Sequence, residues 1–260
     1  MVKYHFITYS TPDFKMFAEV NKETAINIGK FDEATIYSPD NLDDSFKMNN
    51  NAILKQSRLG GYAIWKPYII LKKLLEMEDG DILCYNDSKY MWFKNIRIFE
   101  NDILKNKDIG VYYNKPNDNK IHLEKKFTKI DAYILMNISG NIINQVKESP
   151  QVWSGFILIR KNFETIRFIS EWLTYVQDPR ISTDIPSIFS KEMPVFNENR
   201  HDQTILSLLI KRYNINMHHL DKTYMLDMRN PVDEKFIPQH LRAHLTDHNY
   251  AYRKLGKMLI

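Results

Sequence analysis

The 260-residue sequence has one cysteine and eight glycines, and both shortages restrict what the protein can be. A single cysteine, Cys84, excludes an internal disulfide framework and a multi-cysteine zinc site. It fits a reducing compartment, so we expect a cytoplasmic protein. Neither the G-x-G-x-x-G fingerprint nor a Walker A loop is present. If a nucleotide binds, it is not held by those loops.

Long hydrophobic runs and concentrated charge are also missing. No stretch approaches the ~20 apolar residues of a membrane helix, and the first nine residues carry no apolar run with a small-residue cleavage site, so we expect no membrane span and no signal peptide. Lys and Arg exceed Asp and Glu by 36 − 32 = 4 and are spread along the chain. This argues against a nucleic-acid groove and suits a phosphate-bearing ligand.

What the sequence does contain is an alternation of short strands and amphipathic helices. With 43% hydrophobic residues, the chain has enough apolar surface for a globular core. The alternation predicts an α/β domain with a mostly parallel central sheet flanked by helices, and ligands bind such sheets beyond the carboxyl ends of the strands. We expect one domain over residues 1–215 and a C-terminal extension, 216–260, packed on it. The patterns predict strands over 4–9, 34–38, 81–86, 109–113 and 152–159, and helices over 14–28, 68–77, 127–136, 163–176 and 202–213.

The first candidate for chemistry is Asp87, which follows the hydrophobic strand 81–86. A carboxylate at a strand end is well placed to bind a hard divalent cation, which prefers oxygen ligands. The alternative is a turn-forming Asn-Asp-Ser cluster, and spacing alone favours the turn.

The second candidate is the segment 58–67, which combines Arg58 and Lys66 with two adjacent glycines and two aromatic residues just before a helix. Helix N-termini attract anions, and the two cations could add charge-assisted hydrogen bonds to phosphate. In the alternative, Tyr62 and Trp65 anchor a loop to the core and Arg58 is solvated.

Two further clusters contain histidine. His201 and Asp202 precede a predicted helix, where the aspartate could be an N-cap and the histidine an acid, a base or an orienting group. Near the C-terminus, His240, Arg242, His244 and His248 could bind a metal or phosphate, or form a solvated basic tail.

Four blocks, in order, resemble GT-A-type nucleotide-sugar glycosyltransferases of a group found in large DNA viruses and bacterial glycan clusters. More loosely, they are similar to glycogenin-type galactosyl- and glucosyltransferases. The blocks cover roughly residues 3–213 with their flanks and are Gly61-Tyr62-Ala63-Ile64-Trp65-Lys66-Pro67, Tyr85-Asn86-Asp87-Ser88, Gly155-Phe156-Ile157-Leu158-Ile159-Arg160 and Arg200-His201-Asp202-Gln203-Thr204-Ile205-Leu206-Ser207.

The resemblance implies a metal site with one departure from the family pattern. Asp87 matches the first acid of an Asp-x-Asp motif, which implies Mn²⁺ or Mg²⁺, but Lys89 stands at the second acid. A protonated lysine cannot ligate a cation. Either Asp87 binds the metal with another ligand, such as His244, or Lys89 supplies part of the positive charge and the reaction needs no metal.

The resemblance also implies roles for the other matching residues. Asp202 and Gln203, with His201, match the catalytic pair beside the sugar, and Ser154 and Gly155 match the sugar or acceptor side. The donor nucleotide would be bound by residues at the first strand end, in the Trp-Lys-Pro block and beside Asp87: Thr8, Tyr9, Ser10, Arg58, Trp65, Lys66, Asn86 and Asp87.

The implied activity is glycosyl transfer from a nucleotide-diphosphate sugar to a glycan or protein acceptor. The alternative is a non-catalytic nucleotide-sugar-binding protein on the same fold, which Lys89 favours. Because Asp87 and Asp202 lie at predicted element ends, we expect their replacement by alanine to lower turnover more than tenfold and leave the thermal melt nearly unchanged.

Overall fold

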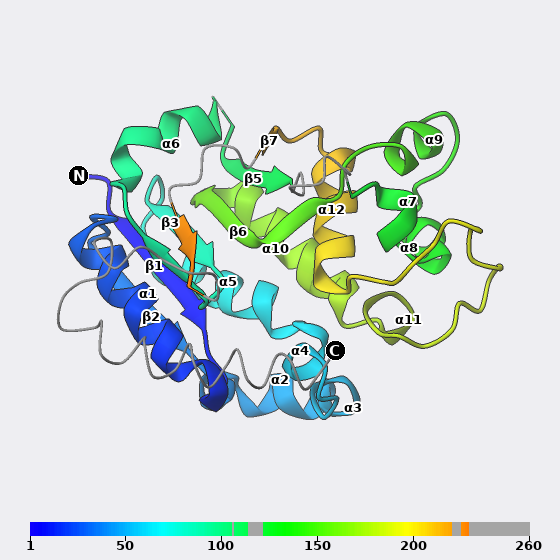
Figure 1. Cartoon of the computed structure of the whole chain (residues 1–260), viewed down its shortest axis with the longest axis horizontal. Helices are drawn as coiled ribbons and strands as arrows, with labels where there is room; N and C mark the ends of the chain where they lie inside the picture. Colours follow the sequence, from blue (N-terminus) through cyan, green and yellow to red (C-terminus); the bar gives the residue numbers. More distant parts are fainter. Residues whose placement is uncertain (106, 114–121, 220–224, 229–260) are drawn as a thin grey trace.

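The structure is a computed structural model, and it describes residues 1–105, 107–113, 122–219 and 225–228 (Figure 1). Within these residues, six strands form one sheet in the order β2-β1-β3-β6-β5-β7, and β4 pairs with β8 in a separate ribbon. The strands are β1 (Tyr4–Tyr9), β2 (Glu33–Tyr37), β3 (Ile82–Asn86), β4 (Tyr90–Trp92), β5 (Ile109–Tyr113), β6 (Val152–Arg160), β7 (Met217–His219) and β8 (Met225–Asp227).

Helices cover both faces of the sheet, and α7, α8, α9 and α11 gather at one end of the molecule (Figure 1). The α-helices are α1 (Lys15–Asn27), α2 (Asp44–Asn49), α3 (Asn51–Leu54), α4 (Leu59–Tyr62), α5 (Trp65–Glu76), α6 (Ile96–Leu104), α7 (Glu124–Phe127), α8 (Ile130–Leu135), α9 (Ile142–Lys147), α10 (Phe163–Val176), α11 (Pro179–Ser182) and α12 (Asp202–Arg212). Two 3₁₀ turns are η1 (Pro12–Phe14) and η2 (Pro39–Asn41). In the described part of the chain, none of the helices has both the length and the hydropathy for a membrane crossing.

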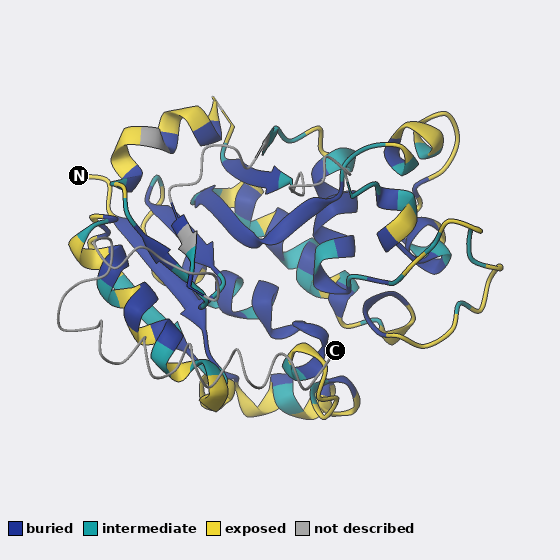
Figure 2. Ribbon diagram, in the orientation of Figure 1, coloured by how far each residue is buried: buried dark blue, intermediate teal, exposed yellow. Residues whose placement is uncertain are grey.

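The central strands are buried on both faces, which explains their nearly continuous apolar sequences (Figure 2). Alternate side chains of β3 illustrate this: Leu83 packs with the core under α5, α10 and α12, whereas Cys84 packs with the core that includes residues of α1 and α6. The expected α/β architecture with a mostly parallel sheet is confirmed.

One strand runs against the others, which the sequence pattern did not indicate. β1 pairs in parallel with β2 and β3, and β5 pairs in parallel with β7, whereas β6 is antiparallel to both β3 and β5. The start of β6 therefore lies at the same sheet edge as the ends of β1 and β3. This reversal brings Ser154 next to the segment that follows β3.

β6 also carries a bulge at this edge. Its pairing with β5 jumps from Val111–Ile157 to Tyr112–Trp153, which leaves residues 154–156 without a partner on β5. Bulges bend a strand locally and re-aim its side chains. The polar groups of Ser154 and Gly155 are consequently available for contacts beyond the strand end.

One predicted helix is interrupted. The sequence predicts a helix over 127–136, but the chain is extended at Thr128, between α7 and α8. The carbonyl of Phe127 accepts hydrogen bonds from Gln151 Nε2 and Thr204 Oγ1, so tertiary partners replace helical ones. The predicted domain limits stay a prediction, because most of 216–260 lies outside the described residues.

Candidate active site

A cavity of about 650 Å³ lies at the edge where β1 and β3 end and β6 begins. The first residues of α5 and α12, two helices whose N-termini point positive dipole ends at this edge, line it. Asp87, Asp202 and Gln203 all face this cavity. The structure thus brings Asp87 together with the adjacent pair Asp202 and Gln203, which lies far from it in the sequence, while the roles of all three remain predictions.

A left-handed turn precedes α5 on the cavity wall. The five residues 59–63 all have positive φ angles, from 52° at Leu59 to 88° at Gly61. The turn is closed by hydrogen bonds from the Tyr62 amide to the Arg58 carbonyl at 2.7 Å and from the Ala63 amide to the Leu59 carbonyl at 3.3 Å. Left-handed helical backbone costs about 1–2 kcal/mol for each non-glycine residue, so this segment holds strain beside the cavity.

An aromatic pair lines the same wall. The rings of Tyr9 and Trp65 stack with centroids 3.6 Å apart and planes 13° from parallel. Trp65 Nε1 donates a hydrogen bond to the Leu59 carbonyl at 3.1 Å, which ties the pair to the left-handed turn. The Trp-Lys-Pro block therefore places one flat aromatic surface and one cation at the start of α5.

Lys66 is the centre of the site's charges. Its side chain is only 5% exposed, and Nζ lies 2.8 Å from Asp202 Oδ2 and 3.8 Å from Asp87 Oδ1. Nζ also donates to the hydroxyl of Ser154 at 3.1 Å and to its carbonyl at 3.3 Å. Burial lowers the pKa of Lys66, but Asp202 and Asp87 outweigh it and the net shift is upward, so the group is an ammonium.

Asp87 is surrounded by donors. The hydroxyl of Tyr85 donates to Oδ1 at 2.9 Å, and Lys89 Nζ lies 3.5 Å from Oδ2. Burial raises the pKa of Asp87, but Lys66 and Lys89 overcome it and the net shift is downward. Asp87 is therefore an ionised carboxylate held between two ammonium groups.

The acid–amide pair is fixed from the other side. Asp202 is 2% exposed. Gln203 Nε2 donates to Gln151 Oε1 at 2.8 Å, and its Oε1 accepts from the Ser154 amide at 3.3 Å. The bulge of β6 thus positions both Lys66 and Gln203 through one residue.

His201 is buried and neutral. Its Nδ1 lies 2.9 Å from the carbonyl of Ser182, an arrangement in which Nδ1–H donates and Nε2 keeps its lone pair. Nε2 has no hydrogen-bond partner among the described residues, and burial lowers the pKa of the imidazole despite Asp184. The backbone at His201 has φ 60° and ψ −117°, a strained conformation for a non-glycine residue.

Four residues predicted to contact the donor or the acceptor do not line this cavity in the described part of the chain. Three of them instead position the loop after β3: Thr8 Oγ1 donates to the Asn86 carbonyl at 2.7 Å, and the Gly155 carbonyl accepts from Asn86 Nδ2 and from the Asp87 amide. Ser10 is buried, and its hydroxyl donates to the adjacent Thr11 carbonyl. A polar residue at a strand end can thus stabilise the loop that carries Asp87 without lining the cavity itself.

Arg58 lines the cavity but is engaged elsewhere. Its guanidinium lies 3.1 Å from Asp184 Oδ2 and 3.0 Å from Glu198 Oε2, with 45% of the side chain exposed. A phosphate would have to compete with two carboxylates for it.

Trp153 is a cavity residue that sequence reasoning missed. A Cβ atom at Gly155 would lie 2.2 Å from the Trp153 ring, so the glycine makes room for the indole beside the cavity. The sequence Trp153-Ser154-Gly155 places a large residue next to two small ones, which could have indicated this packing. The position of the indole beside the cavity, however, depends on the bulge of β6.

The described residues do not form a divalent-cation site. Asp87 and Asp202 are bridged by the Lys66 ammonium, and the second oxygen of Asp87 faces Lys89. No group of three or more His, Cys, Asp and Glu side chains in the described residues could hold a metal. His244, proposed as a ligand, lies outside the described residues with the rest of its cluster, so Mn²⁺ or Mg²⁺ stays a prediction.

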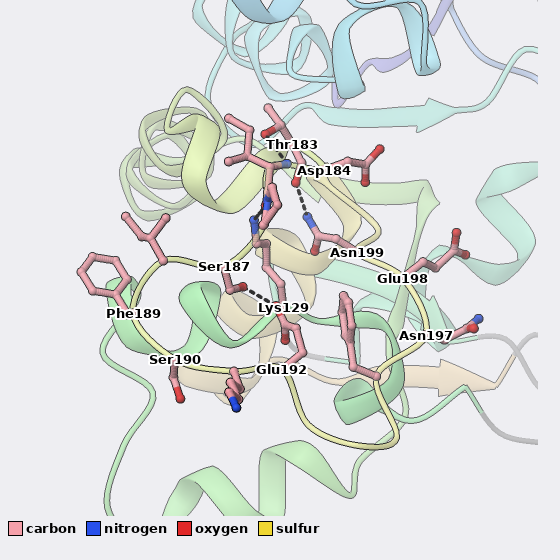
Figure 3. Close-up of a pocket in the computed structure, with 15 residues that line it drawn as sticks. Lys129, Thr183, Asp184, Ser187, Phe189, Ser190, Glu192, Asn197, Glu198 and Asn199 are labelled. Carbon is pink, nitrogen blue, oxygen red and sulfur yellow. Dashed lines mark hydrogen bonds between the residues drawn. The ribbon is translucent and has the colours of Figure 1, made fainter.

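Figure 3 shows a second cavity, of about 600 Å³. It adjoins the first, because Glu198 lines both. Its wall is the long loop between α11 and α12, which is held by Lys129 and by Glu192: the ammonium donates to the Ile185 carbonyl, and the carboxylate accepts from the Ile130 amide at 2.9 Å. Long structured loops without helix or strand are usually functional.

Comparisons with solved structures find distant likenesses, three of which are described below. Neither the family models nor the curated proteins yield a match. The solved structures are mouse xyloside xylosyltransferase 1 in its apo form, the apo WbbM bifunctional glycosyltransferase, and a glycosyltransferase involved in glycosylation of the major capsid of PBCV-1.

The three likenesses have similar strength. Identities are 13%, 9% and 11%, and TM-scores are 0.45, 0.45 and 0.46. The matches cover 85%, 80% and 93% of this chain, and 85%, 37% and 91% of the respective structures. The chain thus spans little more than a third of the WbbM chain, and at these scores its activity is inferred from the residues of the cavity.

Proposed function

We propose that the protein is a glycosyltransferase that moves a sugar from a nucleotide-diphosphate sugar to a hydroxyl of a glycan or protein acceptor. One observation carries this proposal: the Lys66 ammonium lies between the carboxylates of Asp87 and Asp202 in one cavity at the edge where strands end. The four sequence blocks that resemble GT-A-type transferases meet at this edge and support it.

The donor fits the cavity by its chemistry. The stacked Tyr9 and Trp65 offer an aromatic wall for the nucleoside, and the N-termini of α5 and α12 favour its diphosphate. The Lys66 ammonium adds positive charge to the cavity through its ion pairs with Asp202 and Asp87, and Arg58 becomes available when phosphate replaces Asp184 or Glu198.

The transfer breaks one covalent bond and forms one. The bond between the anomeric carbon and the phosphate oxygen breaks, and its electron pair leaves with the diphosphate. The acceptor oxygen forms the new bond to the anomeric carbon. Asp202 and Gln203 lie where a carboxylate and an amide oxygen stabilise the oxocarbenium-like sugar.

The acceptor proton needs a destination. If the acceptor attacks from the face opposite the diphosphate, a side chain must take the proton. The carboxylate of Asp202 is engaged in an ion pair with Lys66, whereas the neighbouring His201 keeps an unused lone pair at Nε2. We therefore assign that proton to His201. If the attack is from the same face, the departing phosphate oxygen takes it.

The second cavity is the proposed acceptor side. It adjoins the donor cavity at Glu198 and presents both carboxylates and apolar groups, a combination that suits a hydroxyl-bearing acceptor. The proposal involves no nucleic acid and places the reaction in the cytoplasm.

The test is a thermal-shift screen against the five common nucleoside diphosphates and their sugars, with and without Mn²⁺. A ligand that binds only the folded state at 100 times its Kd stabilises it by about 2.7 kcal/mol, so at least one diphosphate should raise the melting temperature. The matching nucleosides without phosphate serve as the control. Absence of a shift with every nucleotide, in both conditions, would overturn the proposal.

Hydrolysis of the nucleotide sugar that binds distinguishes a glycosyltransferase from a non-catalytic nucleotide-sugar-binding protein. A transferase should release free sugar slowly in the absence of acceptor, whereas a binding protein on the same fold should leave the donor intact over the same period.

A further inference from the structure

We propose that Lys89 binds the departing diphosphate and supplies the positive charge for which a divalent cation was expected, so that transfer proceeds without a metal. This inference rests on the proposed function and specifies how its site handles charge. The geometry around Asp87 carries it.

The hydrogen-bonding capacity of Lys66 is already used. An ammonium has three N–H donors. In Lys66 they face Asp202 at 2.8 Å and the hydroxyl and carbonyl of Ser154 at 3.1 and 3.3 Å, and the side chain is almost fully buried. Lys66 therefore organises the two carboxylates, and its charge and its hydrogen bonds are directed at protein groups.

Lys89 is in the opposite situation. It lines the cavity with 21% of its side chain exposed, and among the described residues its Nζ faces one carboxylate, Asp87 Oδ2, at 3.5 Å. The ring of Tyr90 lies beside it, with its centroid 5.4 Å from Nζ. At least one N–H of Lys89 is thus directed to no described protein acceptor.

The charges of the two lysines and two aspartates around Asp87 balance without a metal. Lys66 and Lys89 carry two positive charges, and Asp87 and Asp202 carry two negative ones. Oδ1 of Asp87 accepts from Tyr85 and faces Lys66, while Oδ2 faces Lys89. A divalent cation at Asp87 would have to displace an ammonium or lie against it, which like charges oppose.

In the proposed step, Lys89 stays protonated. As the bond from the anomeric carbon to the phosphate oxygen breaks, the electron pair and negative charge move onto the diphosphate. Lys89 Nζ donates to a diphosphate oxygen, and Asp87 keeps the ammonium in place. Interactions that strengthen as charge develops are those that accelerate the step.

The experiment measures Kd for the nucleoside diphosphate that binds, by titration calorimetry in EDTA, for wild type, Lys89→Met and Lys89→Arg. Lys107→Met is the matched control, because Lys107 is exposed and lies outside the cavity lining. Thermal melts establish that each variant is folded. Sugar release from the bound donor is measured in EDTA and in Mn²⁺.

We expect wild type to bind the diphosphate in EDTA and Mn²⁺ to tighten binding less than twofold. Lys89→Met should raise Kd at least tenfold, Lys89→Arg should recover most of the loss, and Lys107→Met should change nothing. Binding of the parent nucleoside should be equal in all four proteins, which a general structural defect would not produce.

Three outcomes overturn the inference. Diphosphate binding or sugar release that EDTA abolishes and Mn²⁺ restores would show that a metal is needed while leaving the transferase proposal intact. Unchanged diphosphate affinity in Lys89→Met would remove the role of this lysine. Failure of every nucleotide to bind in either condition would remove the proposed function itself, and the inference with it.

Discussion

Lys66 shows how a single buried cation determines the state of its neighbours. Its ammonium is desolvated, and its two carboxylate partners come from the loop after β3 and the first turn of α12. Removing one partner of a buried ion pair is costly, because the other charge then stays buried with neither a partner nor water to stabilise it. The burial of Asp202 argues against the expectation that its replacement leaves the thermal melt nearly unchanged, because the residue lies at an element end but is only 2% exposed.

We expect Asp202→Ala to lower the free energy of unfolding by about 3 kcal/mol, because it leaves the Lys66 ammonium without its nearest partner. It should also lower turnover more than tenfold. Asp87→Ala should cost less stability, since 26% of that side chain is exposed. Urea denaturation and sugar-release assays measure the two effects.

The control for Asp202→Ala is the double variant with Lys66→Met. If the loss comes from an orphaned ammonium, the double variant should be more stable than the sum of the two single losses predicts. Simple additivity would contradict this account of the pair.

His201 gives a prediction about pH. Its folded-state pKa is lowered by burial, while the unfolded chain titrates near the ordinary value of 6.5. Below that value the unfolded chain binds a proton that the folded protein refuses, so stability falls as pH falls toward the folded pKa and is fully retained above 6.5. The His201→Gln variant has no titrating side chain at this position. We expect the stability of wild type relative to this variant to decrease between pH 7.5 and 5, measured by urea denaturation, and a flat difference would contradict the assignment of a neutral imidazole.

The left-handed turn over residues 59–63 is an element whose geometry sets the start of α5. It carries Tyr62 onto the ring of His201, with centroids 4.6 Å apart, and holds Trp65 through the Leu59 carbonyl. Two strained segments, this turn and the entry to α12, therefore contact each other beside the cavity. Strain of this kind persists only where the surrounding structure imposes it.

The two glycines of this turn should respond differently to alanine. At Gly60 an added Cβ meets nothing closer than 3.7 Å, so Gly60→Ala should cost about 1–2 kcal/mol from its positive φ alone. At Gly61 the Cβ would lie 2.6 Å from the Cα of Leu54, so backbone must shift. We expect Gly61→Ala to lose more stability, as measured by urea denaturation, and to weaken nucleoside diphosphate binding as well.

The comparison is internally controlled because both variants add one methyl group. Equal losses in the two would indicate that the turn relaxes around either substitution, and that its geometry is not fixed by α3.

At the scale of the whole molecule, Arg58 connects the two cavities. Its guanidinium reaches from the left-handed turn to Asp184 and Glu198, on the loop that lines the second cavity. Exposed ion pairs contribute little stability, about 0–1 kcal/mol. They can nonetheless hold a loop that has no helix or strand of its own.

We expect Arg58→Met to leave the thermal melt nearly unchanged and to accelerate tryptic cleavage after Lys191, the one basic residue in 183–199. Lys72→Met, which removes another exposed ion pair, with Asp43, is the control. If a nucleoside diphosphate binds Arg58, it should accelerate the same cleavage in wild type. Equal cleavage rates in both variants would show that the loop is held by other contacts.

Much of the fold followed from the sequence because both core faces of the strands are apolar and the helical stripes are regular. β1, β5 and α10 occupy the predicted residues, and Cys84 is a buried free thiol. The convergence of Asp87 with Asp202 and Gln203 was also predicted, from strand ends and from the resemblance. Thr8 and Asn86 are polar residues at strand ends, which is why the sequence predicts that they contact the donor. The hydrogen bonds across β1, β3 and β6 show that they instead support the loop after β3.

The sequence by itself determined which segments form strands and helices, because periodicity and turn residues act locally. The tertiary structure alone decided the direction of β6, the bulge at Ser154, the left-handed backbone before Lys66 and the burial of Asp202. Each of these depends on distant partners: a reversed strand shares its hydrophobic pattern with a parallel one, and a carboxylate acquires its charge state from the ammonium that the fold places beside it.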